Sequence, residues 1–239
     1  MIRTFAISGL IALSSLVPTL AQADEHDHAG DIAVSALDGK LVTGGSHFET
    51  HGVDGYNIYE ADFGDLAGGP WTTKNPGFQT QGGATLTPYA LISFAGLGSL
   101  SFWDGASWGT APTGVGVSIA DVLQDALTTW SATGVTPGET SYVAQVSAAG
   151  TIHDHLALSV TPNATAGAYL IQLQLTSDAY ASSDPFYLVF NRGLSSDAFE
   201  ASVDALTTPV PEPASYALLI AGLAGVGFLM RRRHAATDR

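Results

Sequence analysis

The sequence contains no cysteine, so it has neither disulfide bonds nor thiolate metal ligands. A fold without disulfides depends on burial of apolar side chains for its stability. A bound transition metal would have to be held by imidazole and carboxylate groups. Basic residues are also scarce, because eight lysines and arginines stand against 22 aspartates and glutamates.

Most of the basic residues lie near the two ends of the chain, namely Arg3, Arg231, Arg232, Arg233 and Arg239. Between them lie only Lys40, Lys74 and Arg192, against 20 acidic residues. The resulting charge of about −17 repels nucleic acid phosphates and concentrates cations. We therefore expect no nucleic acid partner, and a chemistry suited to metal ions.

The sequence also lacks an apolar run of about 20 residues, the length that a helix needs to cross a bilayer. At the N-terminus, Arg3, the apolar stretch Phe5–Leu20 and Ala21-Gln22-Ala23 have the three zones of a secretory signal peptide. We expect cleavage after Ala23, so that residues 1–23 are removed and residues 24–208 form one exported domain.

The C-terminal apolar run, Tyr216–Met230, lies between Pro211-Glu212-Pro213 and Arg231-Arg232-Arg233. The arginines predict a membrane stop on the cytoplasmic side, and the prolines separate this short transmembrane helix from the domain before it. Residues 209–239 are therefore predicted to be a sorting and anchor segment.

This tail resembles the PEP-CTERM signal of Gram-negative envelope proteins, with Pro211, Glu212 and Pro213 at its name-giving motif. The resemblance implies transient insertion in the inner membrane, processing by an exosortase, and export to the cell surface or extracellular matrix. A plain short membrane anchor is the alternative.

The exported domain has the pattern of an all-β protein. Ala168–Thr176 alternates apolar and polar residues, and Phe186–Asn191 is a second C-terminal strand. Asp38-Gly39 predicts a hairpin between Ile32–Leu37 and Lys40–Thr43. A further hairpin is predicted about Asp104-Gly105, and another pairs Tyr142–Ser147 with Ile152–Val160.

Only Ile119–Trp130 has a helical pattern, with Val122, Leu123, Ala126 and Leu127 on one side. Eight or more short strands need a second sheet to cover their inner faces. The predicted architecture is therefore a single antiparallel β-sandwich of the jelly-roll or immunoglobulin-like kind.

Six histidines fall in three close pairs: His26 and His28, His47 and His51, and His153 and His155. Alternation along a strand would place His153 and His155 on one face, opposite Ile152, Leu156, Leu158 and Val160. Because zinc prefers three or four ligands, we predict that these six histidines bind zinc or a similar divalent metal. Imidazole must be neutral to bind, so affinity should fall below about pH 6.5.

A wider resemblance concerns the PEP-CTERM family that is repressed by the zinc-uptake regulator. It rests on short motifs: His26-Asp27-His28, Gly30-Asp31-Ile32, Gly39-Lys40-Leu41-Val42-Thr43-Gly44, Pro76-Gly77-Phe78, Ile152-His153-Asp154-His155-Leu156, Gly167-Ala168-Tyr169-Leu170 and Asp184-Pro185-Phe186-Tyr187-Leu188-Val189-Phe190-Asn191. The resemblance implies production during zinc shortage and a role in zinc capture or handling, with His26, His28, His153 and His155 as the family-like positions.

Two other classes of function are an enzyme and a binding or matrix protein without a metal. No catalytic motif is evident: the His-x-His pair lacks the following glutamate of a cupin site, and no nucleophile elbow or phosphate loop occurs. We therefore expect no enzyme. The alternative to metal capture is a matrix, adhesion or carbohydrate-binding protein without a metal, in which Trp71, Trp103, Trp108 and Tyr89 could stack on sugars.

Overall fold

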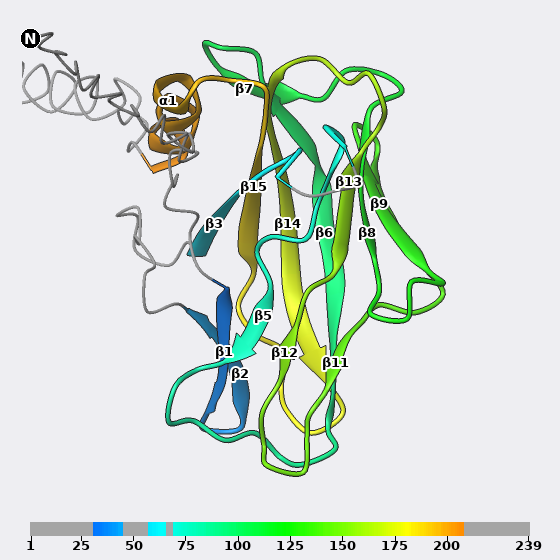
Figure 1. The fold of residues 1–239 in the computed structure, drawn as a ribbon, viewed down its shortest axis with the longest axis vertical. Helices are drawn as coiled ribbons and strands as arrows, with labels where there is room; N and C mark the ends of the chain where they lie inside the picture. The colour runs from blue at the N-terminus through cyan, green and yellow to red at the C-terminus, as the bar shows by residue number, and fades with distance from the viewer. Residues whose placement is uncertain (1–30, 45–56, 66–68, 208–239) are drawn as a thin grey trace, which may run out of the picture.

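The computed structural model describes residues 31–44, 57–65 and 69–207. These residues form three β-sheets and one helix (Figure 1). Among them, no helix combines the length and the apolar character needed to cross a bilayer. The predicted signal peptide and the predicted sorting segment lie outside the described residues.

The first sheet, sheet A, has the strand order β12-β5-β1-β2. Its strands are β12 (His153–Asp154), β5 (Phe78–Thr80), β1 (Ile32–Leu37) and β2 (Lys40–Gly44). Strands β1 and β2 form the predicted hairpin, and Asp38 and Gly39 both have positive φ angles, 51° and 77°. Two such residues are what a type I′ turn requires, so the Asp-Gly prediction is confirmed.

Sheet B is the largest, with the order β11-β6-β14-β15-β3 and β7 added beside β6. Its strands are β11 (Tyr142–Gln145), β6 (Leu91–Trp103), β14 (Gly167–Ser177), β15 (Phe186–Arg192), β3 (Asn57–Asp62) and β7 (Trp108–Thr110). The two predicted C-terminal strands are therefore confirmed as β14 and β15. The hairpin about Asp104-Gly105 is confirmed as β6–β7, with Trp103 opposite Trp108.

Sheet C has the order β10-β9-β8-β13-β4. Its strands are β10 (Gly134–Thr136), β9 (Leu127–Ser131), β8 (Gly116–Ala120), β13 (Ala157–Val160) and β4 (Thr72–Thr73). Sheets A and C share one core with sheet B, because a single cluster joins Val34 of β1, Ile119 of β8 and Ile171 of β14. One face of sheet B is therefore covered by two smaller sheets.

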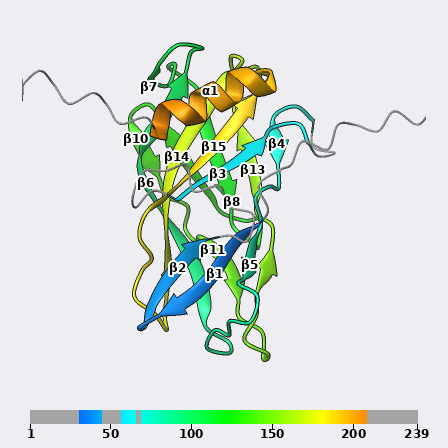
Figure 2. The same ribbon diagram turned by 90° about the vertical axis from the view of Figure 1, so that its left-hand side faces the viewer.

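The helix α1 (Ser196–Thr207) covers the other face of sheet B near one end, as Figure 2 shows. Its Phe199 and Val203 are buried against Trp103, Ala168 and Val189. Along β14 the side chains alternate between the two layers, with Ala168 toward the helix and Tyr169 in the main core. This alternation is the period of two expected of a strand buried on both faces.

The prediction of an all-β fold is confirmed in its main point, but its details differ. The described strands form three sheets, and two strand pairs, β1–β5 and β15–β3, are parallel. The predicted helix Ile119–Trp130 is wrong: its residues belong to β8, a turn and β9. The turn is closed by Gln124, whose φ of 60° is left-handed and ends any helical path.

The predicted hairpin between Tyr142–Ser147 and Ile152–Val160 is also corrected. Its turn exists, because the Ser147 N–H donates to the Thr151 carbonyl. The strands on either side then part, since β11 pairs with β6, β12 with β5, and β13 with β8 and β4. Local alternation does not determine which sheet each short strand joins.

Candidate metal centre

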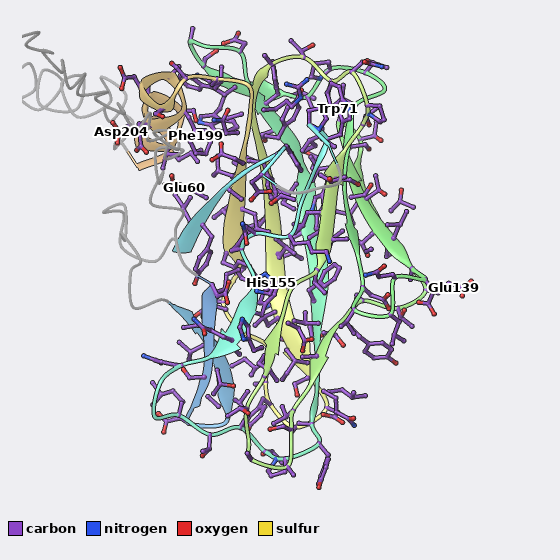
Figure 3. The ribbon with its side chains drawn as sticks, viewed as in Figure 1. Glu60, Trp71, Glu139, His155, Phe199 and Asp204 are labelled. Carbon is purple, nitrogen blue, oxygen red and sulfur yellow. The ribbon has the colours of Figure 1, made fainter. Side chains whose placement is uncertain are left out.

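One carboxylate and two imidazoles meet beside the N-terminal end of β1. The Oδ2 atom of Asp31 lies 3.0 Å from Nε2 of His153 and 3.7 Å from Nε2 of His155. The two Nε2 atoms lie 3.3 Å apart. In Figure 3, His155 lies close to β5 in the middle of the molecule.

Strand register explains this meeting of distant residues. Phe78 of β5 is paired with Ile32 in parallel and with Asp154 in antiparallel orientation. One step toward the start of β5, Gly77 therefore lies between Asp31 on one side and His155 on the other. The cluster is thus set by the pairing of three short strands.

Two main-chain contacts orient the side chains. The Gly77 N–H donates to Oδ1 of Asp31 at 3.0 Å, which leaves Oδ2 directed at the histidines. Nδ1 of His155 lies 2.9 Å from the Lys74 carbonyl, an acceptor to which this ring nitrogen donates. That contact selects the tautomer with a free electron pair on Nε2, which is the arrangement that metal-binding histidines use.

Gly77 is required by the closeness of these groups. A Cβ atom at this position would lie 2.6 Å from Cε1 of His155 and 2.8 Å from Oδ1 of Asp31. Both distances are shorter than van der Waals contact, so a side chain would displace the ring or the carboxylate.

The cluster opens to solvent on its histidine side. The Asp31 side chain is 18% exposed, against 36% for His155 and 64% for His153. Between the two histidines in the sequence, burial raises the pKa of Asp154. The Asp31 carboxylate is therefore held at the buried side of the cluster, and an ion can enter from the exposed side, where the histidines lie.

The three distances match the spacing of metal ligands. Ligands about 2.0–2.1 Å from a tetrahedral zinc ion lie roughly 3.3–3.4 Å from one another. The observed 3.0, 3.3 and 3.7 Å bracket that value. Asp31, His153 and His155 could therefore hold one ion with at least one coordination position left over.

The structure brings together His153 and His155, as expected from the sequence, but the two residues do not lie on one continuous strand. Strand β12 ends at Asp154, and the chain passes His155 before β13 begins in another sheet. The opposite parity is buried as predicted, at Ile152, Leu156, Leu158 and Val160. His26, His28, His47 and His51 lie outside the described residues, as do Pro211, Glu212, Pro213, Arg231, Arg232 and Arg233.

Sequence reasoning missed Asp31 as a candidate ligand. The one indication in the sequence is that Asp31 directly precedes a predicted strand. This position does not reveal which strand pairs with β1 and therefore which side chains lie beside Asp31. Pairing of β1 with β5 and of β5 with β12 joins positions more than 100 residues apart along the chain.

The aromatic residues considered for sugar stacking have different environments. Trp103 is buried, and the Trp108 indole N–H donates to the Ser202 carbonyl of α1 at 2.7 Å. Trp71 lies under the Arg192 guanidinium, 4.0 Å from the ring centroid. Tyr89 is 64% exposed, so of these four residues it alone presents most of its surface to solvent.

Comparison with known protein families identified the C-terminal segment of the chain. Residues 209–233 match the family model described as the PEP-CTERM protein-sorting motif. The searches of curated proteins and of solved structures returned no match. The chain therefore carries a PEP-CTERM sorting motif, a signal that implies export and sorting through an exosortase to the cell surface or the extracellular space.

Proposed function

We propose that this exported protein captures zinc, or a similar divalent cation, at Asp31, His153 and His155. The observation that carries the proposal is the convergence of one carboxylate oxygen and two imidazole nitrogens within 3.0–3.7 Å of one another. The contacts of Gly77 and Lys74 behind them support it, because metal sites commonly fix their ligands in this way.

The choice of zinc rests on ligand chemistry and on resemblance. Imidazole and carboxylate ligands suit zinc, and the spacing fits a tetrahedral ion. The resemblance to PEP-CTERM proteins repressed by the zinc-uptake regulator implies production when zinc is short. Such a protein would gather zinc outside the inner membrane.

His26 and His28 are the proposed sources of a further ligand. Three residues of fully extended chain span at most about 11 Å, so residue 28 is tethered close to Asp31 by covalent geometry alone. His47 follows Gly44 by three residues, and Gly44 pairs with Ala33 of β1, so His47 and His51 stay proposed ligands with a less direct tether to Asp31.

We assign capture and not catalysis to this centre. Enzymes that use a metal generally exclude bulk water from the reacting groups. A ligand such as His153, with 64% of its side chain exposed, favours exchange of the ion with solvent or with a partner.

Calorimetric titration of the full-length protein with Zn²⁺ at neutral pH tests the proposal. We expect binding in the micromolar range or tighter, which is lost in Asp31→Asn and in the double variant His153→Ala/His155→Ala. Asp31→Asn can still accept the Gly77 N–H, so its loss of binding would report the missing charge.

Asp38→Asn is the matched control, because it removes an exposed carboxylate at the other end of β1 and suits a left-handed turn position. Binding that is absent in the parent protein, or unchanged in Asp31→Asn, would refute the proposed centre. A titration of His26→Ala/His28→Ala separately tests the tethered ligand, with weaker affinity expected.

A further inference from the structure

A groove lined mostly by polar residues adjoins the proposed metal centre. It has a volume of about 440 Å³, within the range of roughly 300–1,000 Å³ typical of ligand sites. The groove lies between the β5–β12 pair and the end of β11, and its walls comprise Gln79, Thr80, Gln145, Ser147, Thr151, Ile152, His153 and Asp154.

The walls have an unusual chemistry for a small-molecule site. They present two amides, three hydroxyls, an imidazole and a carboxylate, and Ile152 is the one aliphatic residue among them. No lysine or arginine is among these lining residues, so an anionic ligand would find no counter-charge beyond the imidazole. An apolar ligand would cover polar groups without replacing their hydrogen bonds to water.

A neutral ligand rich in hydroxyl groups matches these walls. The three hydroxyls keep hydrogen-bonding capacity beside the bonds they make within the protein, the amides of Gln79 and Gln145 can donate and accept, and the Asp154 carboxylate accepts. The groove therefore fits a saccharide better than a charged or an apolar molecule.

Several hydrogen bonds hold the groove in shape. The Ile152 N–H donates to Oγ1 of Thr80 at 2.8 Å, which joins β5 to the chain before β12. The hydroxyls of Ser147 and Thr151 lie 2.9 Å apart across the turn that follows β11. A preformed groove loses less conformational entropy when a ligand binds.

Tyr89 lies next to the Gln145 wall. Its N–H donates to the Val146 carbonyl at 2.9 Å, and its own carbonyl accepts the Gln145 amide at 3.4 Å. The residue has a φ of 65°, a left-handed conformation that is uncommon for an aromatic residue, and its side chain is 64% exposed. An aromatic ring presented in this way is suited to stacking on the apolar face of a sugar.

We infer that this groove, together with Tyr89, binds a neutral saccharide chain. Saccharide binding in this groove does not require zinc, although the groove shares His153 with the proposed metal centre. Export to the cell surface or extracellular space places the groove where polysaccharide chains can reach it.

Binding of neutral oligosaccharides to the full-length protein tests this inference. The probes are hexasaccharides of glucose, mannose and galactose, with oligogalacturonate as the anionic comparison, measured by saturation-transfer NMR and titration in buffer with a zinc chelator. We expect at least one neutral probe to bind, and the double variant Gln79→Ala/Gln145→Ala to bind it at least about tenfold more weakly.

Two further variants separate the groove from the metal centre and from misfolding. Tyr89→Gly keeps the left-handed backbone while removing the ring, so we expect weaker saccharide binding with an unchanged thermal unfolding midpoint. His155→Ala removes a metal ligand that does not line the groove, so saccharide binding should be retained.

The inference is overturned if no neutral probe binds, if the anionic probe binds more tightly, or if the double variant binds like the parent protein. Loss of zinc binding in His155→Ala with retained saccharide binding would show that the two functions fail independently.

Discussion

At the scale of single residues, the proposed metal centre depends on positions that are not themselves proposed ligands. Gly77 donates to Asp31 and leaves room for the His155 ring, and the Lys74 carbonyl sets the tautomer of that ring. The affinity of the site should therefore respond to substitutions that leave all three ligands in place.

We expect Gly77→Ala to weaken zinc binding by about 10–100-fold, the range found when groups that orient metal ligands are removed. The added Cβ would displace His155 or Asp31. Zinc titration measures the effect. Gly82→Ala is the control, since a Cβ there meets nothing within 4 Å. Equal affinities for the two variants would contradict this role of Gly77.

Asp121 illustrates a second residue-scale effect, in which hydrogen bonds outweigh burial. The residue is 1% exposed, and burial alone disfavours its charged form. The Thr140 hydroxyl donates to it at 2.5 Å, and together with main-chain N–H donors this lowers the pKa of Asp121. A carboxyl with a lowered pKa in the folded state stabilises the protein above its unfolded pKa, and this stability is lost as the pH falls through the folded value.

We expect Asp121→Asn to lower the free energy of unfolding by about 1–3 kcal/mol at neutral pH. The difference from the parent protein should shrink as the pH falls below 3.8, the ordinary aspartate value. Urea unfolding across pH measures this. Asp125→Asn alters an exposed carboxylate of the same turn and should have little effect. A pH-independent difference would refute the electrostatic explanation.

At the scale of elements, α1 packs on the face of sheet B that the two smaller sheets leave uncovered, near one end of that face. It buries Phe199 and Val203, and its Ser202 carbonyl accepts the Trp108 indole N–H. Because this layer is a single helix, its packing rests on a few apolar side chains.

We expect Phe199→Ala to destabilise the protein by about 3–5 kcal/mol, the cost of removing a large buried aromatic side chain. Tryptophan fluorescence should change as well, since Trp103 and Trp108 pack in the same layer. Thermal unfolding is the measurement. Glu200→Ala, an exposed position of the same helix, should leave the midpoint nearly unchanged. Equal stabilities of the two variants would contradict this packing role.

The sequence predicts local elements better than their assembly. Alternation correctly identifies β14, the apolar stretch after Asp184-Pro185 identifies β15, and Asp38-Gly39 identifies the first hairpin. The pattern of Ile119–Trp130 is misleading because an apolar turn between two strands mimics one face of a helix. Asp31 escapes detection because parallel pairing of β1 with β5 is a non-local event that leaves no local pattern.

At the scale of the whole molecule, the proposed metal centre joins segments that are far apart in the chain. Asp31 precedes the first described strand, and His153 and His155 lie at the passage from sheet A to sheet C. An ion bound there would connect parts that separate on unfolding.

Zinc should therefore raise the thermal unfolding midpoint of the full-length protein. A ligand at 100 times its dissociation constant stabilises the folded state by about 2.7 kcal/mol if it binds the folded state alone. We expect this shift with the parent protein and not with His155→Ala, measured by thermal unfolding, and Mg²⁺ serves as the control cation. A similar shift in His155→Ala would place the zinc elsewhere.

The register of Phe78 with Ile32 and Asp154 also has a consequence for variation in chain length. Residues added in the connection between β3 and β4, which precedes both Lys74 and Gly77, need not alter the pairing of β5 with its neighbours. One residue inserted between Gly77 and Phe78 would move the glycine out of line with Asp31 and His155. Related chains that keep this centre should therefore tolerate insertions between β3 and β4 and none at this peptide bond.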